Sequence, residues 1–137
     1  MREYVLDANA VLRYVEGQPG CEKVKHILVE AKKGKVRLAM SVINYGEVFY
    51  TLLRRLPLAE VYKTLGALRH VLADIIIADE DQTLRAAQIK HHYKLAYADS
   101  FAAAAAIARK ATLVSADPDF EKVGKALKLA KLPRHLV

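Results

Sequence analysis

The sequence is poor in cysteine and lacks any long apolar run. Cys21 is the only cysteine among 137 residues, so no intrachain disulfide can form, which is typical of a reducing compartment. No apolar segment is long enough to span a bilayer, and no signal peptide precedes the first apolar segment, residues 4–6. We therefore expect a cytoplasmic protein that does not associate with a membrane.

Acidic residues are also in deficit. The chain has 15 Asp and Glu against 22 Lys and Arg, and the resulting formal charge of +7 favours a polyanionic partner such as a nucleic acid. An ordinary basic surface is the alternative. Two basic stretches, residues 23–37 and the C-terminal tail, are explained either by a solvated face or by contact with a phosphate backbone. With 53% hydrophobic content, residues 1–137 are expected to form one domain with its own core.

Short apolar runs alternate with segments of helical periodicity along the chain. The runs predict strands at residues 4–6, 36–40, 75–77 and 112–115. The periodic segments predict helices at residues 10–15, 24–31, 42–55, 57–72, 79–92 and from 97 through the five alanines at 102–106. The tail from Phe120 fits either a helix or a strand. This alternation indicates a three-layer α/β domain with a mostly parallel sheet.

Four acids lie where these elements end or begin. Asp7 and Asp117 each follow a predicted strand, Asp99 lies in the first turn of a helix, and Glu47 lies on the flank of another. In open α/β sheets, functional sites lie beyond the carboxyl ends of the strands. We therefore expect these four side chains to converge at that edge.

Converging carboxylates repel one another unless one takes up a proton or a cation lies between them. An all-oxygen ligand set suits Mg²⁺ or Mn²⁺, whereas zinc prefers His or Cys. The five histidines include no pair at the spacing typical of a zinc-binding helix. A divalent ion can lower the pKa of bound water and polarise a phosphoryl oxygen. Together with the basic surface, this pattern predicts hydrolysis of phosphodiester bonds.

Each acid also has a structural explanation. The helix dipole favours Asp99 at a helix start, Asp117 can cap the segment that follows it, and Glu47 alone is typical of a solvated helix residue. Asp7 is harder to explain in this way, because a carboxylate that closes an apolar strand needs a partner. Asp79 also follows a strand, but a helix cap accounts for it.

The order of these motifs resembles that of the PIN-domain nucleases, most closely the VapC-like toxins of prokaryotic toxin–antitoxin pairs. The motifs are Asp7 in Val-Leu-Asp-Ala-Asn, Glu47 in Asn-Tyr-Gly-Glu-Val, Asp99 in Tyr-Ala-Asp-Ser-Phe-Ala-Ala-Ala and Asp117 in Leu-Val-Ser-Ala-Asp-Pro-Asp-Phe. The resemblance runs the whole length of the chain. The set in this order is more specific than any one motif.

The resemblance implies a three-layer α/β/α PIN-like domain that acts as a metal-dependent endoribonuclease. In such an enzyme, the acidic pocket that holds Mg²⁺ or Mn²⁺ and activates water would comprise Asp7, Glu47, Asp99 and Asp117. Asn9 and Ser115 match polar positions that support this pocket. Ala8 departs from the pattern, because many relatives have Ser or Thr there. The family also implies a homodimer and a small antitoxin protein that occupies the acidic groove.

Three other functions fit parts of the pattern. One is a housekeeping RNA-processing PIN nuclease without an antitoxin, and another is a basic RNA-binding or scaffold module without catalysis. The third is a phospho-acceptor signalling domain. The signalling function is disfavoured, because such domains usually carry paired acids after the first strand and Asp7 stands alone.

Overall fold

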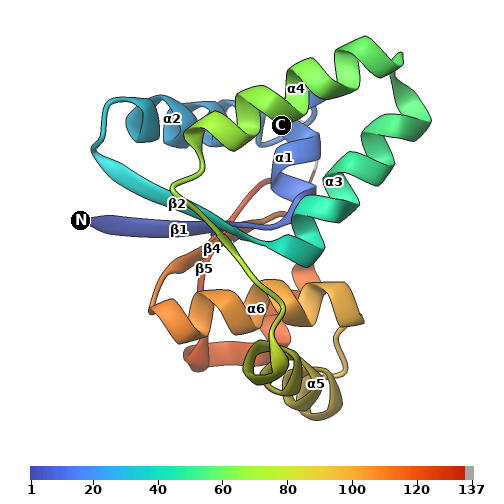
Figure 1. The fold of residues 1–137 in the computed structure, drawn as a ribbon. Coiled ribbons are helices and arrows are strands. Elements are labelled where there is room, and N and C mark those ends of the chain that lie inside the picture. The colour runs from blue at the N-terminus through green and yellow to red at the C-terminus, as the bar shows by residue number, and fades with distance from the viewer. Residues whose placement is uncertain (135–137) are drawn as a thin grey trace.

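The computed structural model describes residues 1–134 and shows a five-stranded sheet between two layers of helices (Figure 1). The strands are β1 (Arg2–Leu6), β2 (Val36–Ser41), β3 (Asp74–Ile76), β4 (Thr112–Ser115) and β5 (Lys128–Lys131). The α-helices are α1 (Ala8–Val15), α2 (Cys21–Lys32), α3 (Val42–Arg55), α4 (Leu58–Val71), α5 (Glu80–Tyr93) and α6 (Tyr97–Arg109), and η1 (Pro118–Ala126) is a 3₁₀ helix. The predicted three-layer α/β/α class is confirmed, and the strands pair in parallel throughout.

The strand β1 lies at the centre of the sheet, whose order is β3-β2-β1-β4-β5. Its side chains alternate between the two faces, so that Val5 packs in the cluster that contains α6 while Leu6 packs in the cluster built by α1 to α4. Because helices cover both faces, Val5 and Leu6 are fully buried. The next residue, Asp7, is therefore carried into the interior at the carboxyl edge of the sheet.

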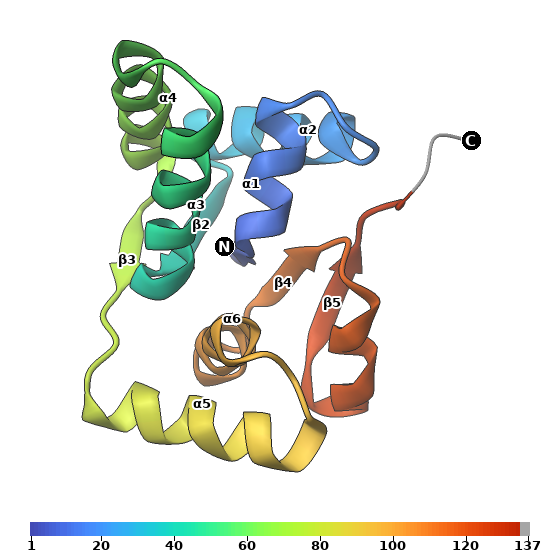
Figure 2. The same ribbon diagram turned by 90° about the vertical axis from the view of Figure 1, so that its right-hand side faces the viewer.

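The two helical layers bring separate segments to that edge. Helices α1 to α4 lie on one side of the sheet, and α5 and α6 lie on the other (Figure 2). The five alanines at 102–106 are all buried, and this small face lets α6 pack against β1, β2 and β4. The first turn of α6, which carries Asp99, is thereby fixed opposite the start of α3.

Most predicted boundaries agree with the structure, one prediction needs correction, and one alternative that the sequence left open is resolved. Ser41 caps α3 by accepting a hydrogen bond from the Ile43 amide, and Asp79 caps α5. The third strand does not include Ile77, which is 72% exposed, because β3 is an edge strand covered less completely than the strands inside the sheet. The tail from Phe120, which fitted either a helix or a strand, contains both, since η1 leads into β5. No helix within residues 1–134 has the length and apolar content needed to cross a membrane.

Candidate active site

Asp7 is the most deeply buried acid of the predicted set. Its side chain follows β1, the residue is 3% exposed, and its Oδ2 accepts a hydrogen bond of 2.7 Å from the Ser115 hydroxyl. Burial raises the pKa of Asp7 to about 7, and the negative charges of Asp99 and Glu47 raise it further. The hydrogen bonds from Ser115 and from the Ala8 amide lower the pKa of Asp7, but the effect of burial is larger.

Asp99 lies in the first turn of α6 and is half-buried. Burial is the largest cause that raises the pKa of Asp99 to about 6, followed by the charge of Asp117 and then those of Glu47 and Asp119. Asp117 therefore lies near enough to raise the pKa of Asp99, although 18 residues separate them in the chain.

Glu47 reaches the same region from the exposed flank of α3, where Asn44 holds it. The Asn44 amide group donates hydrogen bonds of 2.9 Å to Glu47 Oε1 and 3.1 Å to the Ala98 carbonyl oxygen. Because Ala98 precedes Asp99, the buried Asn44 side chain ties the start of α3 to the start of α6. The Asn44 Oδ1 atom is buried and has no hydrogen-bond partner within the described part of the chain.

Asn44 was not among the residues that the sequence singled out as functional. A signal for it exists, because Asn44, Val48 and Leu52 recur at intervals of four and are the buried residues of α3. A polar side chain on a buried helical stripe needs hydrogen-bond partners, and such a residue is a candidate for a role in a site.

Asn9 and Ser115 hold the backbone around the last acid. Asn9 Oδ1 accepts a hydrogen bond of 2.9 Å from the Ala116 amide, and Ser115 Oγ accepts one of 3.0 Å from the Asp117 amide. Asp117 also has the structural role that its position allows, since its Oδ1 caps η1 by accepting a bond from the Asp119 amide. Its second carboxylate oxygen is not used by that cap.

None of the four predicted acids forms an ion pair within residues 1–134. Seven other acids in this part of the chain do, and they are Glu3, Glu16, Glu30, Asp74, Asp81, Asp119 and Glu121. A chain with 22 Lys and Arg therefore leaves Asp7, the most buried acid among the described residues, without a cationic partner. Negative charge gathered in this way favours a bound cation.

The donors fit a hard divalent cation in their chemistry but do not form a closed cage. All of them are oxygen atoms, as Mg²⁺ and Mn²⁺ prefer. Within residues 1–134, however, no three Asp, Glu, His or Cys side chains lie close enough together to hold one ion. Mg²⁺ commonly binds through one or two carboxylates and keeps several waters. The pair of Asp99 and Asp117 fits that mode, with Asp7 and Glu47 contributing charge from nearby.

Comparison with known proteins places this geometry in a family. The family model described as PIN domain matches residues 4–126. No curated protein sequence matches the chain.

Several solved structures share the fold. VapBC2 from Rickettsia felis, bound to a DNA fragment from its promoter, has a TM-score of 0.77 at 20% identity and covers 95% of this chain and 98% of that chain. DNA-bound VapBC from Salmonella typhimurium has a TM-score of 0.74 at 15% identity, and the match covers 96% of this chain and 98% of that chain. VapC20 from Mycobacterium tuberculosis is described as a Sarcin-Ricin loop cleaving toxin. It has a TM-score of 0.69 at 15% identity, and the match covers 88% of this chain and 95% of that chain.

Proposed function

We propose that this chain, which belongs to the PIN domain family, is a metal-dependent endoribonuclease and the toxin of a toxin–antitoxin pair. The observation that carries the proposal is the group of unpaired acids at the carboxyl edge of the sheet, where the pKa values of Asp7 and Asp99 are both raised. The similar structures support it, because they include VapBC complexes and one toxin described as cleaving the Sarcin-Ricin loop.

In this proposal the four acids have different tasks. Asp99 and Asp117 would hold Mg²⁺ or Mn²⁺ through their carboxylates, and Glu47 and Asp7 would add negative charge. A bound divalent ion supplies an activated water and polarises a phosphoryl oxygen. Ser115 orients the Asp7 carboxylate, Asn44 orients Glu47, and Asn9 fixes the backbone that leads to Asp117.

The Ser115 hydroxyl provides a test of this arrangement. We expect Ser115→Ala to slow RNA cleavage by about 10- to 100-fold. Ser115 Oγ also accepts a hydrogen bond from the amide of Asp117, a proposed metal ligand, and groups that orient metal ligands typically contribute that much. Ser100→Ala is the matched control, since Ser100 is equally buried but its hydroxyl donates only to the carbonyl oxygen of Ala96, the N-cap of α6. Cleavage rates in Mg²⁺ or Mn²⁺ measure the effect. Equal cleavage rates for Ser115→Ala and wild type would show that Ser115 has no role in the site.

An antitoxin partner and a homodimer belong to the same proposal. Large apolar side chains are exposed along the α3–α4 pair, including Tyr50 at 62%, Leu58 at 59% and Tyr62 at 58%. Figure 1 shows that this pair projects away from the sheet. Exposed apolar surface of this kind is typical of protein-binding faces. It supports a protein partner in addition to the RNA substrate.

Induced expression separates a toxin from a housekeeping nuclease. We expect expression of the wild-type chain to arrest growth, and co-expression of the product of the neighbouring small gene to restore it. Expression of the Asp99→Asn variant is the control and is expected to leave growth normal, because it lacks a proposed metal ligand. If wild-type expression leaves growth normal while the purified protein cuts RNA, the housekeeping function is correct.

A further inference from the structure

A pocket lies at the edge of the sheet opposite the acids, around the amino ends of the strands. Its walls come from the starts of β1, β2, β4 and β5, from α2, and from the end of α6. Parallel sheets usually bind ligands at their carboxyl edge, so this pocket is separate from the acidic site.

The volume of this pocket is ≈ 810 Å³, which is in the range of sites that take a ligand larger than a single phosphate group.

The pocket is lined mainly by cations. Its charged side chains are Arg2, Lys23, Arg37, Arg109, Lys110 and Lys128, with Glu3 as the one acid among the described residues that line it. The two edges of the sheet therefore carry opposite charge, acidic at the carboxyl ends of the strands and basic at the amino ends. A polyanion is attracted to the basic edge and repelled by the acidic edge when no cation is bound there.

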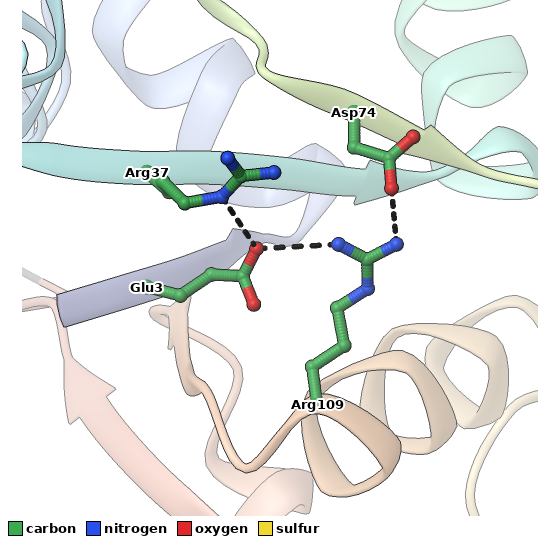
Figure 3. Close-up of polar contacts among 4 residues, drawn as sticks. All are labelled: Glu3, Arg37, Asp74 and Arg109. Atoms are coloured by element: carbon green, nitrogen blue, oxygen red, sulfur yellow. Dashed lines mark hydrogen bonds and ion pairs between the residues drawn. The ribbon is translucent and has the colours of Figure 1, made fainter. Parts of the chain in front are cut away.

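Two of the guanidinium groups are held in place by carboxylates (Figure 3). Glu3 Oε2 accepts a hydrogen bond of 3.2 Å from Arg109 Nη1 and lies 3.7 Å from Arg37 Nε, and Asp74 pairs with Arg109 Nη2. The Glu3 side chain is only 17% exposed, so this network is partly shielded from solvent. Cations fixed in this way lose little freedom when an anion binds.

Two of the other cations, Lys110 and Lys128, remain available to a ligand. The side chains of Lys110 and Lys128 are exposed, and neither has an ion-pair or hydrogen-bond partner within the part of the chain that the structure describes. Lys110 follows α6 and Lys128 begins β5, so they approach the pocket from different elements. A ligand that contacts both must offer more than one negative group.

We infer that this basic pocket binds the phosphate backbone of an RNA strand, as a contact separate from the acidic edge. The choice of RNA rests on the proposed function, whereas the preference for phosphate groups rests on the pocket itself. Contacts between Lys or Arg and phosphates supply most sequence-independent affinity for nucleic acids and position the strand. The pocket then holds substrate at one edge of the sheet while another part of the strand reaches the acids.

Binding of a fluorescent single-stranded RNA tests the inference, with EDTA present so that no cleavage occurs. We expect the double variant Lys110→Gln/Lys128→Gln to bind about 25-fold more weakly at 0.1 M salt, because each lost phosphate contact is worth about fivefold there. The slope of log affinity against log salt should fall by about 1.4. Fluorescence anisotropy measures both quantities, and Lys110→Arg/Lys128→Arg should restore the affinity.

The matched control is Lys25→Gln/Lys63→Gln, which removes the same charge from exposed lysines that line a different pocket. Equal losses in the two double variants would overturn the inference, because they would reflect net charge alone. Unchanged RNA binding with lost binding of inorganic tripolyphosphate would also overturn it, in favour of a small phosphate ligand. A wild-type protein that binds RNA through this pocket but cuts none in Mg²⁺ or Mn²⁺ would contradict the proposed function and leave the inference standing.

Discussion

The Asp99→Asn variant is expected to cleave RNA at least about a hundredfold more slowly than wild type in Mg²⁺ or Mn²⁺. Substitution of groups that merely orient a metal ligand costs up to about a hundredfold, so loss of a direct ligand should cost at least as much. The variant should still fold, because it removes a charge whose raised pKa shows that the folded state disfavours it. Cleavage rates and thermal melting in EDTA measure the two effects.

Asp79→Asn is the matched control for this substitution. Asp79 is also an acid at a helix start, where its side chain accepts a hydrogen bond of 2.8 Å from the Gln82 amide. Asn is as good a cap as Asp, so this variant should keep both its stability and its cleavage rate. Cleavage by Asp99→Asn at the wild-type rate would mean that Asp99 is only a favourable charge at the start of α6. Marked destabilisation of Asp99→Asn in EDTA would point to a structural acid.

The metal-free protein is expected to lose stability as the pH rises from about 4 to about 7. The pKa of Asp7 is 3.8 when unperturbed and about 7 in the fold, so within this window the folded state binds a proton that the unfolded state has released. The free energy of unfolding therefore falls with rising pH. For Asp7, which is almost fully buried, the loss amounts to about 4 kcal/mol across the window. Asp99, whose pKa is raised to about 6, lowers the free energy of unfolding in the same way up to about pH 6.

Urea unfolding in EDTA at several pH values measures this effect as the difference between wild type and Asp7→Asn. The variant cannot ionise at this position, so its stability should lack the Asp7 contribution and exceed that of wild type most at pH 8. Mg²⁺ or Mn²⁺ should stabilise wild type at pH 8 more than at pH 5, because ligation requires ionised carboxylates. A pH dependence that is the same in both proteins would show that Asp7 does not carry a buried charge.

The sequence predicted the class of fold because its inner strands are apolar. β1, β2 and β4 are covered on both faces, and their residues form short apolar runs. β5 was ambiguous because its residues, Lys128–Lys131, place charges at both ends of a strand at the sheet edge. Ile77 led to the opposite error. Because it is apolar it was predicted to belong to the third strand, but it lies exposed just beyond the end of β3. Edge strands lack the pattern that burial imposes on central ones.

The acids of the candidate site were predictable from their place in the chain, but their surroundings were not. Asp7 follows a buried strand, and this alone indicates a carboxylate that needs a partner. Asn44 links Glu47 to the start of α6. This link depends on how α3 and α6 pack together, and no local sequence pattern reveals that packing. The roles of the acids as metal ligands stay a prediction.

The basic pocket was equally out of reach of sequence reasoning. Its cations are scattered from Arg2 to Lys128, and they meet only because parallel strands begin at one edge of the sheet. The basic stretch at residues 23–37 drew attention as a run, yet only Lys23 and Arg37 among its Lys and Arg residues line the pocket. Proximity in the fold, rather than in the chain, creates the excess of positive charge.

Anomalous diffraction from a crystal soaked in Mn²⁺ tests the central claim most directly, because it locates the ion. The account predicts a peak within about 2–2.5 Å of carboxylate oxygens of Asp99 and Asp117, and no such peak in Asp99→Asn crystals. A Mn²⁺ ion bound elsewhere in the chain, with these two carboxylates unligated, would contradict it.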